Sequence, residues 1–441
     1  MNILLLNLPV HIPTVMPYSL AMMNCILRSS INETITMIDL NSFFHLNKFP
    51  EHYRSKGYDY FKALDKFEAA SRSHYQNLSR AAREGRKPEG YDLLIKRILA
   101  EKPDVVCISF TYNSQMYFAD SLVKELNFKK IKVIVGGPAD YSKLKDVVRL
   151  ENYSKLIDHL ETLGAKRFVK MKNAIIDFSD FNKKEYFTND VVYPLRTAIS
   201  CPYKQCAFCT HHGNLPYHMM DLSAIKDAIL VNKMKKVCFI DDDFPIVRIK
   251  ELAKLLEPLR VEWWCQLRPV KELIPLFHML YDSGLRSVAW GVESGSQKVL
   301  DLMEKGTKVE DVMDVLKASN EIGIKNMTYI MFGYPGETEA EFMKTIEFLE
   351  KNAKSIELVS LSVFGLQRGS RIYDNPEEFG VKKVEEIDRT LYGEKITYEP
   401  KEGLTQLQAK ELKLKMKGRI NKVNKVPKVL NSCKEQILNF D

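Results

Sequence analysis

The chain has 441 residues, of which 45% are hydrophobic and 28% charged, and its formal charge is +8. This length predicts two or three domains with sizeable cores, and the composition is typical of a globular protein. Eight cysteines in so long a chain exclude a disulfide framework, and the sequence has no apolar run long enough for a membrane helix. The first residues lack the flanks of a secretory signal, so we expect a cytoplasmic protein without a membrane partner.

Residues 1–150 predict an open parallel sheet of the Rossmann type, interrupted by a helical insertion at about residues 42–102. A helix over Tyr117–Leu126 is expected to join the last two strands, and Gly136-Gly137 then allows a close backbone approach. Ligands of such sheets bind at the carboxyl ends of the strands. The expected strands are short apolar runs, as in parallel sheets buried on both faces: Ile3–Leu6, Thr34–Ile38, Val105–Phe110 and Ile131–Val135.

After a connector at residues 151–189, residues 190–365 predict a partial (β/α)6 barrel. Single helical segments separate six expected strands, and function in such barrels gathers at the strand carboxyl ends. Residues 366–441 form a C-terminal region with a basic helical tail. The expected strands lie near Leu195–Ser200, Lys236–Ile240, Val261–Leu267, Ser287–Val292, Met327–Phe332 and Ile356–Ser362.

Three cysteines, Cys201, Cys206 and Cys209, follow the first barrel strand within nine residues. Three thiolates can hold three corners of an iron–sulfur cluster and leave one iron free for a small molecule. A structural zinc site would need a fourth protein ligand, which His211 or His212 could supply. Structural zinc usually uses two Cys-x2-Cys pairs, and the sequence lacks the second pair.

The cysteine spacing and the segments after it resemble the radical S-adenosylmethionine (SAM) superfamily over roughly residues 190–365. The resemblance implies a 4Fe–4S cluster on the three cysteines, whose free iron chelates SAM through its amino and carboxylate groups. This chain has C-x4-C-x2-C, whereas C-x3-C-x2-C is commonest in the family, so the departure bears on the subfamily. The other matching segments are Val237–Phe244, Trp264–Arg268, Gly291–Ser296 and Gly333–Thr338.

Polar and small residues at the ends of the later strands are candidates to bind SAM. Carboxylates suit the ammonium or a ribose hydroxyl, and an arginine grips a carboxylate with two hydrogen bonds. A glycine lets the backbone reach the adenine, and an aromatic ring shields the cluster. The predicted SAM contacts are Phe208, Asp241, Asp242, Gln266, Arg268, Glu293 and Gly333. Surface ion pairs and helix caps are the alternative explanation for the charged members of this set.

The N-terminal segments Pro103–Phe110 and Ile131–Pro138 resemble the cobalamin-binding domain that is joined to many radical SAM enzymes. This resemblance implies contacts of Ser109, Thr111, Gly136 and Gly137 with the nucleotide tail of cobalamin. The D-x-H-x-x-G signature, which supplies a histidine to cobalt, is absent, so a bound cobalamin would lack that ligand. The alternative is a nucleotide-type sheet without cobalamin.

The combined resemblance favours a cobalamin-dependent methyltransferase or peptide-modifying enzyme, in the branch that matures ribosomally made peptides. It would take a peptide or small-molecule substrate and a reductant such as flavodoxin or ferredoxin. A cobalamin-independent radical SAM epimerase or cross-linking enzyme is the alternative. The C-terminal segment Lys401–Asp441 has ten Lys or Arg and four Asp or Glu. This basic tail is also compatible with a protein of another class, which would be stabilised by zinc and would bind nucleic acid through the tail. Otherwise we expect no nucleic-acid partner.

Overall fold

The computed structural model describes residues 1–57, 59–169, 174–211, 215–390 and 393–440. It divides into two compact units. Unit 1 contains Met1–Val191 with Asp227–Lys233 and Asp388–Glu394, and unit 2 contains Val192–Lys226, Met234–Ile387 and Lys395–Asp441. No helix in these described ranges is both long and apolar enough to cross a membrane.

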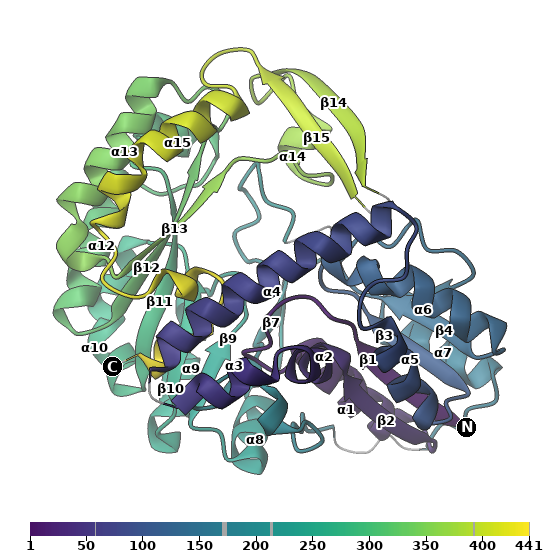
Figure 1. Cartoon of the computed structure of the whole chain (residues 1–441). Coiled ribbons are helices and arrows are strands. Elements are labelled where there is room, and N and C mark those ends of the chain that lie inside the picture. Colours follow the sequence, from purple (N-terminus) through teal and green to yellow (C-terminus); the bar gives the residue numbers. More distant parts are fainter. Residues whose placement is uncertain (58, 170–173, 212–214, 391–392, 441) are drawn as a thin grey trace. The chain divides into compact units, whose positions relative to one another are not determined.

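Unit 1 is built on a parallel five-stranded sheet with the order β2-β1-β3-β4-β5, which confirms the predicted α/β class (Figure 1). The interior strand β1 is buried from Ile3 onward because apolar residues occupy both faces. The fifth strand, β5, is two residues long and was not expected. The strands are β1 (Asn2–Asn7), β2 (Thr34–Asp39), β3 (Val105–Ser109), β4 (Lys132–Gly136) and β5 (Val148–Arg149).

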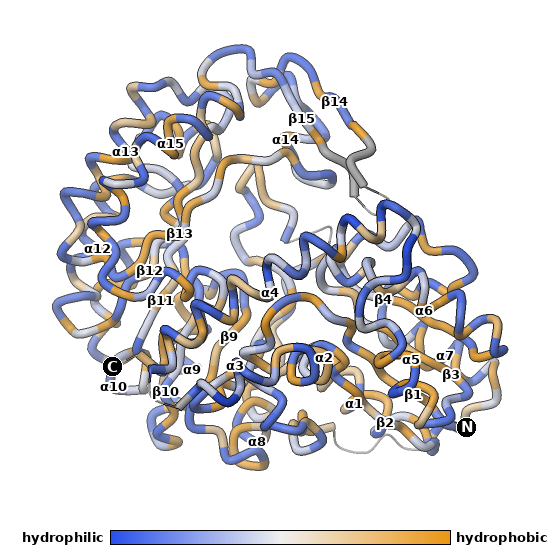
Figure 2. Tube along the Cα trace, in the orientation of Figure 1, coloured by the Kyte–Doolittle hydropathy of each residue, from blue (hydrophilic) through white to orange (hydrophobic). Residues whose placement is uncertain are grey.

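The described residues of the N-terminal part of unit 1 form seven α-helices, and four of them make up the predicted insertion between β2 and β3. The longest helix, α4, buries Tyr60 and Phe67, so these insertion aromatics pack in the core. Figure 2 shows the alternation of apolar and polar segments along α4. The helices are α1 (Tyr18–Ser30), α2 (Leu40–Lys48), α3 (Pro50–Arg54), α4 (Tyr60–Arg83), α5 (Tyr91–Ala100), α6 (Met116–Phe128) and α7 (Tyr153–Thr162).

Unit 2 is built on a parallel six-stranded sheet with the order β13-β12-β11-β10-β9-β6, so β6 and β13 form its two edges. This open arrangement is the partial barrel that the sequence predicts. Its core includes the fully buried side chains of Phe239, Trp263, Trp290 and Phe332. The strands are β6 (Val192–Leu195), β9 (Lys236–Phe239), β10 (Glu262–Leu267), β11 (Leu285–Glu293), β12 (Lys325–Phe332) and β13 (Leu358–Val363).

Helices connect these strands along the chain, and α15 lies beside α13 at the C-terminal end (Figure 1). Helix α15 begins with a capping box between Thr405 and Gln408 and is anchored by Ala409, Leu412 and Ile420. The helices are α8 (Leu222–Asn232), α9 (Ile246–Leu256), α10 (Phe277–Asp282), α11 (Gln297–Leu302), α12 (Val309–Glu321), α13 (Glu339–Lys351), α14 (Arg371–Asp374) and α15 (Gln406–Asn421).

Two small antiparallel pairs were not expected from the sequence. A single strand was expected near Leu195–Ser200. In the structure, β6 ends at Leu195, and a separate short strand, β7 (Ala198–Ile199), pairs with β8 (His218–Met219). This pair closes the base of the segment that carries the three cysteines. In the C-terminal region, β14 (Val381–Thr390) and β15 (Gly393–Pro400) form a two-stranded sheet.

Candidate active site

The cysteine loop, defined here as Cys201–Cys209, follows β6 and β7 at the carboxyl end of the unit 2 sheet. Its three cysteines are free thiols that are partly buried. Burial raises the pKa of Cys206 to about 11, although Lys305 and Arg268 oppose this rise. Burial likewise raises the pKa values of Cys201 and Cys209. The thiols are therefore protonated near neutral pH, and a bound metal would have to displace their protons.

The zinc alternative requires a histidine beside these thiols. The ring Nδ1 of His211 lies 3.0 Å from Oδ1 of Asp242, so this ring is engaged elsewhere. His212 lies outside the described residues. Within the described ranges, no three His, Cys, Asp or Glu side chains are arranged around a single ion. A cubane cluster has a different requirement, because each cysteine binds a different iron atom and the three sulfurs need not converge.

Three consecutive carboxylates follow β9, and the structure gives them different partners. The carboxylate of Asp241 is buried and accepts hydrogen bonds from the backbone N–H of Thr197 at 3.0 Å and of Ala198 at 2.7 Å. Burial raises the pKa of Asp241 to about 6, against the effect of these hydrogen bonds. Asp241 therefore holds the backbone between β6 and β7, and its contact with SAM stays a prediction.

The two carboxylate oxygens of Asp242 differ in their contacts. Its Oδ1 faces His211, and its Oδ2 lies 3.5 Å from Nη2 of Arg196. Oδ2 is buried and has no hydrogen-bond partner among the described residues. Buried polar atoms are almost always paired in native proteins. The Arg196 guanidinium is the cation next to this oxygen, and the contact of Asp242 with SAM stays a prediction.

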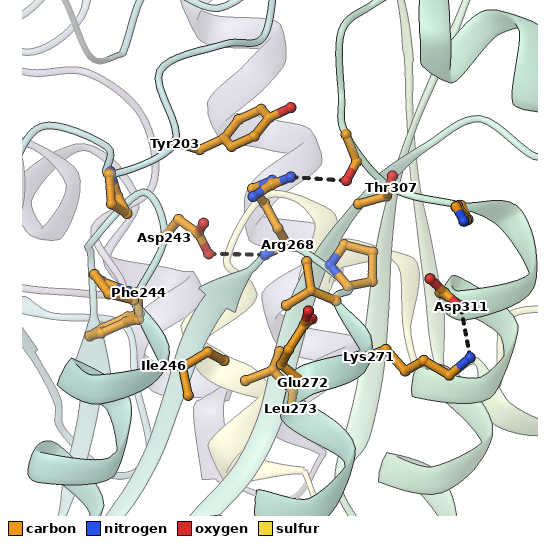
Figure 3. Close-up of a pocket in the computed structure, with 16 residues that line it drawn as sticks. Tyr203, Asp243, Phe244, Ile246, Arg268, Lys271, Glu272, Leu273, Thr307 and Asp311 are labelled. Atoms are coloured by element: carbon orange, nitrogen blue, oxygen red, sulfur yellow. Dashed lines mark hydrogen bonds and ion pairs between the residues drawn. The ribbon is translucent and has the colours of Figure 1, made fainter.

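The β10 candidates are engaged within unit 2. The side-chain oxygen of Gln266 accepts a hydrogen bond from Tyr329 Oη at 2.8 Å. The guanidinium of Arg268 donates to the carbonyl oxygens of Lys305 at 2.9 Å and Gly306 at 3.3 Å. Arg268 also lines a cavity of about 650 Å³, together with residues of the cysteine loop and the segment after α11 (Figure 3). Its hydrogen bonds therefore hold the chain at Lys305 and Gly306, and its contact with a SAM carboxylate stays a prediction.

Glu293 ends β11 with a left-handed backbone, φ +68, next to a register shift in the pairing with β12. Such backbone strain in a residue other than glycine is frequent at functional sites. Its Oε1 accepts a hydrogen bond from Lys305 Nζ at 2.9 Å, and Lys305 is only 5% exposed. Burial lowers the pKa of Lys305, but the neighbouring Glu293 and Cys206 outweigh this effect and raise it overall. The lysine is therefore charged beside the cysteine loop.

Small residues near the site make room for the chain itself. A Cβ at Gly291 would lie 2.8 Å from Lys305 Nζ, so the glycine accommodates the buried ion pair. Gly333, with φ +76, would place a Cβ 2.7 Å from Ala409 of α15. Its carbonyl accepts from Tyr398 Oη at 2.7 Å, and its N–H donates to Glu337. The N–H and the carbonyl of Gly333 therefore each have a partner within the chain, and the contact of this residue with adenine stays a prediction.

Phe208 and Lys305 lie together within the site. The Lys305 ammonium is 5.7 Å from the ring centroid of Phe208, a cation–π distance. Sequence reasoning singled out Phe208 from the cysteine motif but missed Lys305. A lysine after an amphipathic helix is usually solvent-exposed, and only the adjacent Gly306 hinted at a special backbone.

The carboxyl edge of the unit 1 sheet holds the other candidates. Ser109 Oγ donates to Ser19 Oγ at 3.0 Å, and Thr111 is exposed in the loop after β3. A Cβ at Gly137 would lie 2.1 Å from the carbonyl oxygen of Phe110, and one at Gly136 would lie 2.8 Å from that of Leu150. The close approach that these glycines allow is therefore between parts of the chain. The predicted contacts of the four residues with cobalamin remain a prediction.

Comparison with known proteins agrees with this geometry. Residues 197–349 match the model of the radical SAM superfamily. These residues therefore form a radical SAM domain, which agrees with the cysteine loop and the parallel barrel. An uncharacterized methyltransferase of Pyrococcus horikoshii is 24% identical over 190 residues. That match covers 40% of this chain and 40% of the relative.

Two solved structures share the fold over most of the chain. The radical SAM methyltransferase TsrM from Kitasatospora setae, solved with tryptophan substrate and a SAM analogue, is similar with a TM-score of 0.63 and 14% identity. The match covers 87% of this chain and 78% of TsrM. The cobalamin-dependent radical SAM enzyme OxsB, solved with aqua-cobalamin, gives a TM-score of 0.57 and 16% identity, covering 86% of this chain and 56% of OxsB. At these identities the comparison shows a shared fold.

Proposed function

We propose that this protein is a cobalamin-dependent radical SAM enzyme that methylates or otherwise functionalises an unactivated carbon of a peptide or small molecule. The observation that carries the proposal is a three-cysteine loop at the carboxyl edge of a barrel whose residues 197–349 match the superfamily model. When bound, a 4Fe–4S cluster with SAM would supply the reducing electron and the radical chemistry of this superfamily. The electron would come from a reductant such as flavodoxin or ferredoxin in the cytoplasm.

The donor set around the cysteine loop fits this cofactor pair. Cys201, Cys206 and Cys209 would hold three corners of the cluster, with Phe208 covering it. Lys305 is a buried cation beside Cys206 and would neutralise part of the negative charge of the thiolates. The uncharged state of the free thiols also favours a chain that stays folded before the cluster is inserted.

The side chains near the loop support an assignment of the SAM contacts. The orphaned Oδ2 of Asp242 would accept the SAM ammonium. Lys305 would bind the SAM carboxylate, and Glu293, which is paired with Lys305, would accept hydrogen bonds from the ribose hydroxyls. Gln266 adds an amide at the end of β10. Three of the seven residues predicted from sequence, Asp241, Arg268 and Gly333, would support the site through their hydrogen bonds to other parts of the chain.

Unit 1 supports the cobalamin part of the proposal through its fold. The loops after β3 and β4 expose Thr111 and Gly137 at the carboxyl edge of the sheet, where ligands of open α/β sheets bind. Cobalamin-dependent OxsB shares the fold over 86% of this chain. The cobalamin-independent epimerase or cross-linking enzyme stays as the second candidate because no cobalt-ligating histidine motif is present in the sequence.

The test is anaerobic reconstitution with iron and sulfide, followed by measurement of SAM cleavage. The wild type should contain iron and sulfide in near-equal amounts and cleave SAM, and the Cys206→Ala variant should do neither. Cys25→Ala is the matched control, because Cys25 is also a partly buried free thiol but lies on α1. Equal SAM cleavage by Cys206→Ala would contradict the proposal. Protein from cobalamin-fed cells should carry cobalt, and its absence would favour the second candidate.

A further inference from the structure

The cysteine loop is held on one side by the brace segment, defined here as Met303–Lys308. This segment follows α11 and leads to α12. The backbone N–H of Ala207 donates to the carbonyl oxygen of Met303 at 3.0 Å. Tyr203 Oη donates to the carbonyl oxygen of Glu304 at 2.9 Å. The brace segment thus touches the loop between its first and second cysteines and again between the second and third.

The contact between Tyr203 and the brace segment leaves no spare room. Gly306 has φ +66, and a Cβ there would lie 2.1 Å from Tyr203 Oη. Real Cβ atoms do not approach that closely, so any larger residue would displace the tyrosine or the segment. Glycine is required here both for its left-handed backbone and for this approach.

Arg268 fixes the other face of the same tyrosine. Its guanidinium carbon lies 3.4 Å from the centroid of the Tyr203 ring, a stacked geometry (Figure 3). The guanidinium donates to the Lys305 and Gly306 carbonyl oxygens, and the backbone N–H of Arg268 donates to Asp243 at 3.1 Å. Arg268 therefore links the end of β10, the brace segment and Tyr203 into one unit.

A second segment holds the opposite side of the loop. Arg371 Nη1 donates to the carbonyl oxygen of Gln205 at 3.0 Å, and the N–H of Ile372 donates to the carbonyl oxygen of Ala207 at 3.0 Å. Arg371 also forms an ion pair with Glu304 of the brace segment. The two supports are thus connected to each other as well as to the loop.

We propose that Tyr203, Gly306 and Arg268 are positioning residues that hold the cysteine loop in its ligating shape and so determine how firmly the cluster is retained. This inference rests on the proposed function, because it needs a cluster on the three cysteines. The first gap of the motif has four residues, and Tyr203 stands within it. A longer gap has more conformations to lose on binding, so restraint by the brace segment lowers that entropic cost.

The experiment measures the rate at which reconstituted protein loses iron to a chelator, followed by the decay of the cluster absorbance. Gly306→Ala should lose iron about tenfold faster, since one displaced buried contact corresponds to a factor of this order. Tyr203→Phe, which lacks only the hydroxyl, should lose iron roughly threefold faster, the effect of part of one hydrogen bond. Gly85→Ala is the matched control, because Gly85 has the same φ of +66 with no atom within 4 Å of an added Cβ. It should behave as wild type.

Arg268→Gln separates positioning from SAM binding. If Arg268 is a positioning residue, the variant should lose iron faster than the wild type. The SAM concentration needed to change the spectrum of the remaining cluster should be the same as for the wild type. Weaker SAM binding with unchanged iron retention would overturn the inference and restore Arg268 as a SAM ligand.

The remaining outcomes are distinguishable. A wild type that takes up no cluster would overturn the proposed function and this inference together. A wild type that holds its cluster no better than Gly306→Ala and Tyr203→Phe would overturn this inference alone. Should Gly306→Ala fail to fold, Tyr203→Phe decides, because loss of a hydroxyl leaves the packing of the ring intact.

Discussion

The carboxyl edges of the two parallel sheets differ in how completely their polar groups are paired. In unit 1, Asn7 Nδ2 donates to Asp39 Oδ1 at 2.8 Å, Gln115 Nε2 donates to Asn7 Oδ1 at 2.9 Å, and Tyr186 Oη donates to Asp39 Oδ2 at 2.6 Å. In unit 2, three buried side-chain atoms near this edge have no hydrogen-bond partner among the described residues. They are Asp242 Oδ2, Arg196 Nε and Arg268 Nε.

The unit 2 edge also contains residues with a strained backbone. At the unit 2 edge, Ser200 and Glu293 have φ values of +70 and +68. Strained residues and unpaired buried atoms both cost free energy, and folded proteins retain them mainly where a ligand or a reaction uses them. The hydrogen bonds of Asn7, Asp39 and Gln115 are made within unit 1, where the buried Tyr75 Oη has no hydrogen-bond partner among the described residues. The two edges are thus built from the same kind of sheet but differ in backbone strain and in the pairing of their buried polar groups.

The largest effect is expected from breaking the buried ion pair of unit 2. Lys305→Met would leave the Glu293 carboxylate buried without its cation and should lower the free energy of unfolding by about 3–5 kcal/mol. The double variant with Glu293→Gln should recover most of this loss, because no unpaired charge remains. Urea unfolding measures both, and Lys298→Met, at an exposed position on α11, is the control. A Lys305→Met midpoint equal to that of wild type would contradict the buried pair.

The unit 1 network should respond to pH through Asp39. Burial raises the pKa of Asp39 to about 6, against the hydrogen bonds from Tyr186 and Asn7. The folded state therefore binds this proton more tightly than the unfolded chain, whose carboxyl titrates near pH 4. The contribution of Asp39 to the free energy of unfolding is fully present below pH 4. It falls by roughly 3 kcal/mol as the pH rises from 4 through 6.

Hydrogen exchange of peptides from β1 and β2, corrected for the intrinsic rate, measures this dependence. The Asp39→Asn variant should show a flatter profile between pH 4 and 6, because the amide cannot titrate. Asp92→Asn, at an exposed position on α5, should keep the wild-type profile. Identical profiles for Asp39→Asn and wild type would show that another group carries the dependence.

The neighbouring carboxylates of unit 2 should divide their effects. Asp241→Asn replaces an acceptor of three hydrogen-bond donors, Thr197 N–H, Thr197 Oγ1 and Ala198 N–H, and should cost about 1.5–3 kcal/mol of unfolding free energy. Asp242→Asn should leave the urea midpoint nearly unchanged and weaken SAM binding, measured by titration of the reconstituted enzyme. The reverse pattern would exchange the roles assigned to the two residues.

The smallest effect is expected at the unit 1 edge. Ser109→Ala removes a single hydrogen bond to Ser19 and should cost about 0.5–1.5 kcal/mol, measured by exchange of β3 peptides. Iron content should equal that of wild type, since the residue lies in unit 1. A loss of iron in this variant would show that the two edges are coupled, which the comparison above does not predict.

Much of the fold followed from local pattern. The apolar runs of β1, β3 and β4 are continuous because parallel strands are buried on both faces, and they were located correctly. The β14–β15 pair was missed because Val381, Val384 and Ile387 recur every three residues, a spacing typical of a helix. The break between β6 and β7 was missed because it depends on Asp241, a residue 44 positions away from Thr197.

The sequence by itself determined the class of chemistry, because three closely spaced cysteines followed by polar strand ends are a local arrangement with few other uses. Tertiary structure alone decided which of the polar residues pair with the backbone and which pair with other side chains. Asp241 and Asp242 are chemically alike and adjacent, yet Asp241 accepts hydrogen bonds from backbone N–H groups, whereas Asp242 faces the side chains of Arg196 and His211. Lys305 became part of the site because Gly291 left space for its ammonium beside Glu293. Burial and pairing depend on neighbours brought together by folding, and no local pattern encodes them.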